Sequence, residues 1–123
     1  MNWIGTWRNQ YGSTLRITSD EGNRIQGVFR TALRDSGFFG QDLPVVGVHL
    51  SECLSFTFAG SSAQGDAICS FTGLLREGKL QTLWHVLADS KRVAAATGSG
   101  ERLEKTHWPH AALTNADTFE RVE

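Results

Sequence analysis

The chain has 123 residues, enough for one hydrophobic core and too few for two, so we expect a single domain over residues 1–123. It carries 12 Lys and Arg against 13 Asp and Glu, a net charge of -1 that argues against nucleic acid or an anionic membrane surface as a partner. No apolar run approaches the ~20 residues of a spanning helix, and the first residues lack a signal-peptide pattern, so a soluble chain is expected.

Short apolar runs, separated by turn residues, predict antiparallel strands along most of the chain. Turns are expected at "NQYG", "DEGN", "SSAQGD" and "REGK". The strands are predicted at residues 5–9, 13–19, 24–32, 43–49, 53–59, 67–75, 79–88 and 111–121. Eight antiparallel strands joined mostly by short turns favour an all-β, closed up-and-down barrel, which exposes no edge strand and encloses room for one small ligand.

Two segments interrupt this succession of strands. Residues 34–42, "RDSGFFGQD", form either a flexible flap over one barrel mouth or a loop whose aromatic rings pack against the core. Residues 89–110 are long, charged and rich in small residues, so we expect a long loop before the last strand. A helical turn at "RVAAA" and a mobile stretch at "TGSG" are expected within it.

Alternation along the strands predicts which side chains face the barrel interior. Phe29 and Thr31 share the inward face of their strand, and Trp84 points inward while His85 points outward. Asp117 also has inward parity, although an unpaired carboxylate in an apolar cavity is costly. Asp117 therefore either meets donors from the protein or a ligand, or lies in water at a strand end. The Trp84 indole is either core or part of a ligand site.

The two cysteines are predicted to be free thiols. A hairpin that turns near residues 62–64 places Cys69 opposite Phe58 and Cys53 opposite Leu74, too far apart in register to form a bridge. Two cysteines are also too few for a disulfide framework, and their spacing is not that of a metal site.

An enzyme is the less favoured interpretation. Cys69, His85 and Asp117 offer the groups of a thiol hydrolase, but Cys69 faces inward and His85 outward, so the nucleophile and base do not meet. The other three histidines form no metal-ligand spacing with the cysteines: His49, His107 and His110.

Six motifs, in this order over nearly the whole chain, resemble the avidin and streptavidin family of biotin-binding proteins. They are "GTWRNQYGSTLRIT", "GVFRTAL", "LSFTFAG", "CSFTG", "LQTLWHVL" and "NADTF". The resemblance implies an eight-stranded barrel that closes over biotin, no catalysis, no cofactor, and assembly as a homo-oligomer, commonly a tetramer or dimer. It also implies export, in a secreted or periplasmic setting.

The polar part of the site follows from the resemblance residue by residue. Asn9 and Ser13 match the residues that donate hydrogen bonds to the ureido oxygen of biotin, while Phe29 replaces the tyrosine that supplies a third donor. Thr31 matches a serine that accepts from one ureido N–H, and Asp117 matches the carboxylate that accepts from the other. The missing hydroxyl implies an affinity one to two decades lower, because a donor to a charged acceptor contributes ~1.5–3 kcal/mol.

The apolar part of the site is less similar to the family pattern. Phe58, Phe71 and Trp84 match the aromatic box around the bicyclic ring, with phenyl rings where two indoles are usual. Cys69 replaces a threonine near the thiophane sulfur, and Ala67 replaces a serine that reaches the valerate carboxylate.

Two further residues complete the implied site. Asp35 lies in the flap near a position that often provides a backbone donor to the carboxylate. Trp108 matches a tryptophan that enters the pocket of a neighbouring subunit, or else it anchors the 89–110 segment on its own barrel.

Two other binding functions remain open. One is a pocket adapted to another small ureido or apolar ligand, with weak biotin binding. The other is a protein-interaction barrel with a vestigial pocket, which would use Trp3 and residues 89–110 for its contacts.

Overall fold

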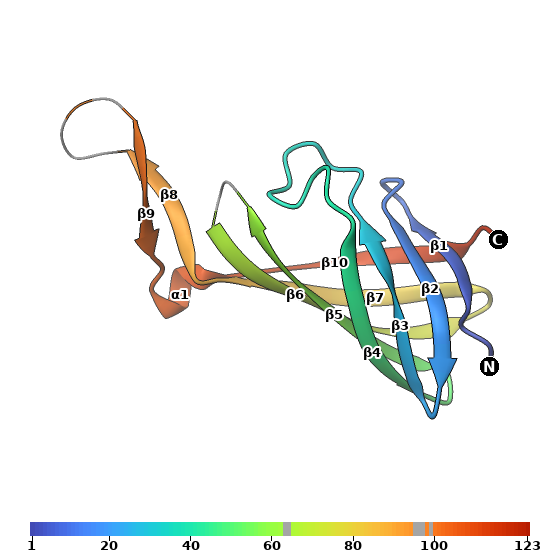
Figure 1. The fold of residues 1–123 in the computed structure, drawn as a ribbon. Helices are drawn as coiled ribbons and strands as arrows, with labels where there is room; N and C mark the ends of the chain where they lie inside the picture. The colour runs from blue at the N-terminus through green and yellow to red at the C-terminus, as the bar shows by residue number, and fades with distance from the viewer. Residues whose placement is uncertain (63–64, 95–97, 99) are drawn as a thin grey trace.

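The computed structural model describes residues 1–62, 65–94, 98 and 100–123, and within these ranges eight antiparallel strands close into a barrel (Figure 1). Around the barrel the strand order is β1-β10-β7-β6-β5-β4-β3-β2. The barrel strands are β1 (Gly5–Asn9), β2 (Thr14–Glu21), β3 (Arg24–Arg30), β4 (Leu43–Leu50), β5 (Cys53–Ser62), β6 (Gly65–Arg76), β7 (Lys79–Ala88) and β10 (Ala112–Arg121). The predicted all-β up-and-down barrel is confirmed.

Tight turns explain why these strands pair in sequence order. Gly22 and Asn23 between β2 and β3 have φ of 60° and 63°, and Glu77 and Gly78 between β6 and β7 have φ of 53° and 78°. Two successive positive φ angles match the twist of an antiparallel pair, which makes such turns common in hairpins. The turns predicted at "DEGN" and "REGK" are therefore present, whereas "SSAQGD" includes residues 63–64, which lie outside the described residues.

The register of β5 and β6 confirms the prediction for the cysteines. Cys69 lies opposite Phe58 and Cys53 lies opposite Leu74. Cys53 is exposed, Cys69 is buried, and both thiols are free.

One end of the barrel, the closed end, is filled by aromatic side chains. Trp3 is fully buried and packs in a tilted arrangement against Trp7, with ring centres 5.6 Å apart, and Nε1 of Trp7 donates to the Trp3 carbonyl at 3.1 Å. Asp20 accepts a hydrogen bond from the Trp3 N–H at 3.3 Å and lies 2.6 Å from Nε2 of His49. The expectation that Trp3 provides an external contact surface is wrong, because its side chain belongs to the core.

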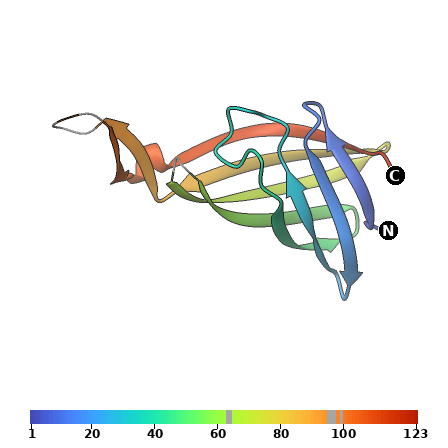
Figure 2. The ribbon, with the colours of Figure 1, turned by 45° about the horizontal axis from the view of Figure 1, so that its top comes forward.

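Residues 89–110 have more regular structure than the sequence predicted. Strands β8 (Ser90–Ala94) and β9 (Glu101–Lys105) form a separate two-stranded sheet, which we call the arm, and a short helix α1 (Trp108–Ala111) leads into β10. Figures 1 and 2 show the arm projecting beyond the barrel. The helical turn expected at "RVAAA" is wrong for residues 92–94, which belong to β8, while residues 95–96, and 97 and 99 of "TGSG", lie outside the described residues.

In the part of the chain that the structure describes, no helix has the length and apolar character needed to cross a membrane.

Candidate ligand-binding site

A cavity of about 90 Å³ lies inside the barrel at the end opposite the closed end, which we call the mouth end. Nine of the twelve residues proposed from the sequence line it: Asn9, Ser13, Phe29, Thr31, Phe58, Cys69, Phe71, Trp84 and Asp117. Four other lining residues were not anticipated: Leu33, Ser36, Phe38 and Val86.

Asn9 ends β1 with its side-chain amide held in one orientation. Its Oδ1 accepts hydrogen bonds from the backbone N–H of Tyr11 at 3.0 Å and of Ser13 at 2.9 Å. Its Nδ2 donates to Oδ2 of Asp117 at 3.1 Å. Since an amide nitrogen carries two hydrogens, one donor of Asn9 is left to face a ligand.

Ser13 and Thr31 place two buried hydroxyl groups next to each other across β2 and β3. The Ser13 Oγ accepts from the N–H of Ala32 at 2.9 Å, and the Thr31 Oγ1 accepts from the N–H of Leu33 at 3.1 Å. The two oxygens are 3.5 Å apart. A hydroxyl has one hydrogen and two lone pairs, so each group keeps both a donor and an acceptor after this backbone contact.

Asp117 faces the interior from β10 and is 9% exposed. In addition to Asn9, Gln10 donates from Nε2 to its Oδ1 at 3.1 Å. Gln10 is itself held by the N–H of Thr118, which donates to its Oε1 at 2.9 Å. The carboxylate therefore has two amide partners and remaining lone pairs. Sequence reasoning missed Gln10, although it lies in the same polar turn as Asn9.

Aromatic rings form the wall beside these polar groups. Phe29 stacks on Phe58 with ring centres 4.8 Å apart, and Phe71 lies 6.2 Å from Trp84. Nε1 of Trp84 is buried without a hydrogen-bond partner among the described residues. Phe29 brings no hydroxyl, so this wall adds no donor at its position.

Phe38 closes the cavity from the loop between β3 and β4. Its ring meets Phe58 edge-on at 5.4 Å, and a Cβ at Gly60 would lie 2.8 Å from it, so a larger residue at position 60 would push the Phe38 ring aside. Phe39 is exposed. The alternative of aromatic rings packed against the core therefore describes Phe38. With this ring in place, the cavity is well below the ~300–1,000 Å³ typical of ligand pockets.

Cys69 provides a neutral thiol to the cavity wall. Burial raises its pKa to about 12, and the nearby charge of Asp117 contributes in the same direction. His85 lies on the outer face of β7 and is exposed, as its parity predicted. Cys69 and His85 thus lie on opposite faces of the sheet and form no nucleophile–base pair.

Three residues proposed from the sequence lie outside the cavity. Asp35 is exposed in the β3–β4 loop. Ala67 and Trp108 line a separate surface groove of about 610 Å³, beside the ends of β5, β6 and β7. Trp108 is 75% exposed, so it does not anchor the preceding segment on its own barrel.

The described residues contain no group of three or more histidine, cysteine or carboxylate side chains able to hold a metal ion.

A closed antiparallel barrel with a buried cavity, polar at one side and aromatic around the rest, defines the class of small-molecule-binding β-barrels. The avidin family model matches residues 1–122, and the chain belongs to the avidin family, which comprises non-catalytic binding proteins. The resemblance found in the sequence motifs is thereby confirmed.

Solved structures of bacterial avidins share this fold. The bradavidin2–biotin complex is 22% identical with a TM-score of 0.72, and the match covers 100% of both chains. Apo shwanavidin is 23% identical with a TM-score of 0.75, covering 100% of this chain and 98% of that one. Bradavidin is 26% identical with a TM-score of 0.73, covering 96% and 79%. A search of curated sequences finds no significant match.

Proposed function

We propose that this protein binds biotin, or a closely related cyclic urea, non-covalently at the mouth end of the barrel. The observation that carries the proposal is the convergence of four buried polar side chains on one side of an aromatic cavity. Asn9 and Ser13 have donors to spare, and Thr31 and Asp117 have lone pairs to spare. A cyclic urea presents the complementary set of one carbonyl oxygen and two N–H groups.

The negative charge of Asp117 polarises the bound ureido group. When the carboxylate accepts from one ureido N–H, it shifts electron density toward the ureido oxygen, where Asn9 and Ser13 donate. Hydrogen bonds to charged groups are roughly twice as strong as neutral ones. Because Asn9 is fixed by backbone groups before the ligand arrives, little ordering cost remains.

A cavity of about 90 Å³ is too small for a bicyclic ligand with a side chain, so its lining must rearrange on binding, and Phe38 is the aromatic ring that a loop contributes to it. The β3–β4 loop that carries Phe38 contacts the barrel here through this ring. We therefore infer that the described conformation is closed, and that ligand entry and loop opening are coupled. Structures of the same fold have been solved as biotin complexes, among them those of bradavidin2 and rhizavidin, which supports the ligand class.

A calorimetric titration with biotin, combined with thermal unfolding, tests the proposal. We expect heat of binding with one biotin per chain and a higher Tm in excess ligand, since a ligand that binds only the folded state stabilises it. Absence of both heat and thermal shift would reject biotin as the ligand.

The second candidate function is an avidin-like pocket adapted to another small ureido or apolar ligand. It is favoured by the phenyl ring of Phe29, which removes a donor, and by Cys69, whose thiol lines the cavity where the family has a hydroxyl near the thiophane sulfur. Titration of biotin against its methyl ester separates the candidates. A micromolar dissociation constant for biotin together with tighter binding of the ester favours the adapted pocket.

We also infer that the chain assembles as a homo-oligomer, a dimer or a tetramer, through the outer face of the barrel. Large apolar side chains are exposed on this face over β4, β6 and β7: Val46, Val48, Leu50, Ile68 and Leu83. In such an assembly the exposed Trp108 would contact a neighbouring subunit. Native mass spectrometry with and without biotin reports subunit count and bound ligand together, and a monomer at all concentrations would contradict this inference.

A further inference from the structure

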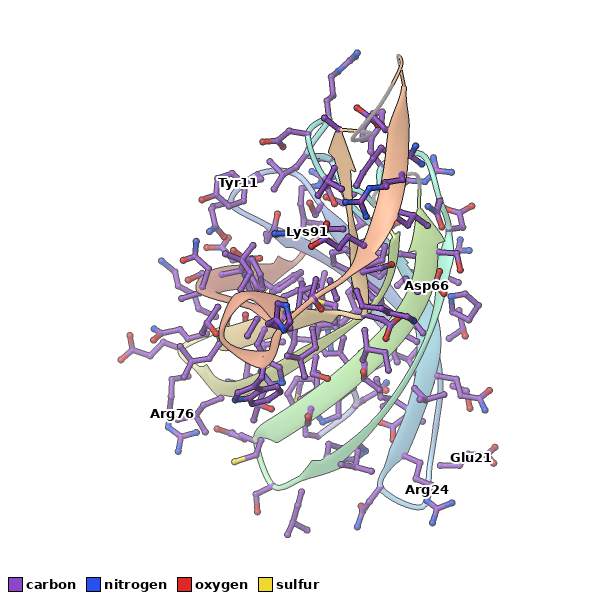
Figure 3. All side chains as sticks on the ribbon, turned by 90° about the vertical axis from the view of Figure 1, so that its left-hand side faces the viewer. Tyr11, Glu21, Arg24, Asp66, Arg76 and Lys91 are labelled. Carbon is purple, nitrogen blue, oxygen red and sulfur yellow. The ribbon has the colours of Figure 1, made fainter. Side chains whose placement is uncertain are left out.

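The arm has one strand edge that no described strand covers. β9 pairs antiparallel with β8, in a register that places Leu103 opposite Arg92 and Lys105 opposite Ser90. Its other edge pairs with nothing among the described residues. Figure 3, which views the molecule from the side of the arm, shows the arm strands in front of the barrel.

The backbone pattern shows which groups of β9 point to this free edge. The N–H of Thr106, just after β9, donates to the carbonyl of Asp89, just before β8, at 3.0 Å, so the backbone groups of Thr106 point toward the β8 side. Along an antiparallel strand, the backbone N–H and C=O groups of successive residues point alternately to the two sides of the strand. Arg102 and Glu104 therefore point their backbone groups toward β8, and the three other residues of β9 point theirs outward: Glu101, Leu103 and Lys105.

The sequence of β9 is complementary to itself when reversed. In an antiparallel pair of two β9 strands centred on Leu103, Glu101 lies opposite Lys105 and Arg102 lies opposite Glu104. Leu103, which is 54% exposed, lies opposite its own copy. Opposite charges in directly opposed positions stabilise a strand pair, and like charges destabilise it.

Among the registers that let the outward backbone groups of two β9 strands form hydrogen bonds, only the one centred on Leu103 places opposite charges across from each other. A shift of two residues in one direction places Arg102 opposite itself, and a shift in the other direction places Glu104 opposite itself. Charges on an edge strand usually discourage pairing with another chain. In β9, the charges favour pairing with a second β9 strand in the register centred on Leu103 and disfavour the shifted registers.

We propose that β9 is a docking edge for β9 of a second copy of this chain, related by a two-fold axis through Leu103. The two arms then form one four-stranded sheet in the order β8, β9, β9, β8. The outward N–H and C=O groups of Glu101, Leu103 and Lys105 exchange hydrogen bonds with those of the partner. This interface is separate from the barrel face and from the ligand site, so it goes beyond the proposed function.

A five-residue edge gives a weak contact by itself, because its buried area falls below that of stable interfaces. Two such edges on a barrel-face dimer act together, since the second contact forms at a high effective concentration. The expected result is concentration-dependent association above the basic oligomer.

Charge reversal tests the register by analytical ultracentrifugation. Glu101→Lys and Lys105→Glu each place like charges opposite one another twice, and we expect each to weaken arm-mediated association roughly tenfold. A mixture of the two variants restores opposite charges and should associate as strongly as the parent chain. Unchanged association of both single variants, or no association by the parent chain above the basic oligomer, would overturn the proposal.

Cysteine cross-linking locates the two-fold axis. In a Cys53→Ser background, Leu103→Cys should form an intermolecular disulfide under mild oxidation, because directly opposed Cα atoms in a hydrogen-bonded pair lie about 5.5 Å apart. Arg102→Cys is the matched control, since its opposite residue is Glu104 of the other copy. Equal cross-linking at both positions would contradict the pairing. Biotin titration of the same variants reads out the ligand site independently, so failure of one proposal leaves the other measurable.

Discussion

The two ends of the barrel each hold a hydrogen-bonded carboxylate but use it differently. At the closed end, Asp20 accepts from the Trp3 N–H and from His49 beside packed aromatic rings, and it lines no cavity among the described pockets. At the mouth end, Asp117 accepts from two side-chain amides beside hydroxyl groups that keep free donors and acceptors. Polar groups satisfied within the protein stabilise the fold, whereas polar groups with spare capacity inside a cavity are available to a ligand.

The largest expected effect comes from removing the donors at the mouth end. The double variant Asn9→Ala/Ser13→Ala should weaken biotin binding by about 3–6 kcal/mol, or two to four decades, because it removes two donors to a polarised oxygen. Calorimetry or competition binding measures the change.

The structure shows that this variant also loses hydrogen bonds within the protein. Asn9 accepts from two backbone N–H groups and Ser13 from one, so thermal unfolding must be measured on the same samples. Each lost hydrogen bond costs ~0.5–1.5 kcal/mol. A lower Tm with unchanged affinity would assign these residues to the fold, and the contrast between the two ends would fail. Tyr11→Ala, at the exposed tip of the same turn, is the matched control.

The next largest effect separates the two thiols. With a pKa near 12, Cys69 has about a thousandfold smaller thiolate fraction at neutral pH than a thiol at 9.0, and it is buried as well. Iodoacetamide should therefore modify the exposed Cys53 before Cys69, with a rate that is higher by at least about tenfold. Peptide mass spectrometry gives the two rates. Rapid modification of Cys69 would mean that the mouth end opens frequently without ligand.

Much of this architecture could be predicted from local sequence patterns. Turn residues such as Gly22 and Gly78 mark where strands end, and alternation assigns Thr31 and Trp84 to the interior. Both signals depend only on neighbouring residues. The convergence of Asn9 and Asp117 followed from parity together with the family motifs, because the two residues are 108 positions apart and local pattern does not bring them together.

The features that sequence reasoning missed depend on contacts between distant segments. The sequence left open whether the aromatic rings of residues 34–42 pack inward, and the choice of Phe38 over Phe39 depends on the space beside Gly60, on another strand. Trp3 is core because it packs on Trp7 and His49 at the closed end. The sequence predicts a loop in place of the arm, because β9 has four charged residues around a single leucine and lacks the apolar face of a barrel strand.

A smaller effect is expected from restoring the missing donor at the mouth end. Phe29→Tyr should strengthen biotin binding by one to two decades, since a hydroxyl that donates to a charged acceptor contributes ~1.5–3 kcal/mol. Phe29→Leu removes the ring without adding a donor and serves as the control. If Phe29→Tyr binds no better than the parent chain, the ring position does not reach the ureido oxygen.

The smallest effect concerns the closed end and depends on pH. His49, through its hydrogen bond, together with the Trp3 N–H, lowers the pKa of Asp20 below its ordinary value of 3.8. A carboxyl whose pKa is lower in the folded state stabilises the fold above its unfolded pKa, and this contribution is lost as pH falls through the folded pKa. Asp20→Asn should therefore lower Tm at neutral pH, and the difference from the parent chain should shrink below about pH 4 and vanish in stronger acid. Thermal unfolding between neutral and acid pH measures this difference. Biotin affinity should not change, because Asp20 lies at the opposite end of the barrel from the cavity. A Tm difference that persists unchanged in acid would show that the shape of the Asp20 side chain matters at the closed end, and not its charge.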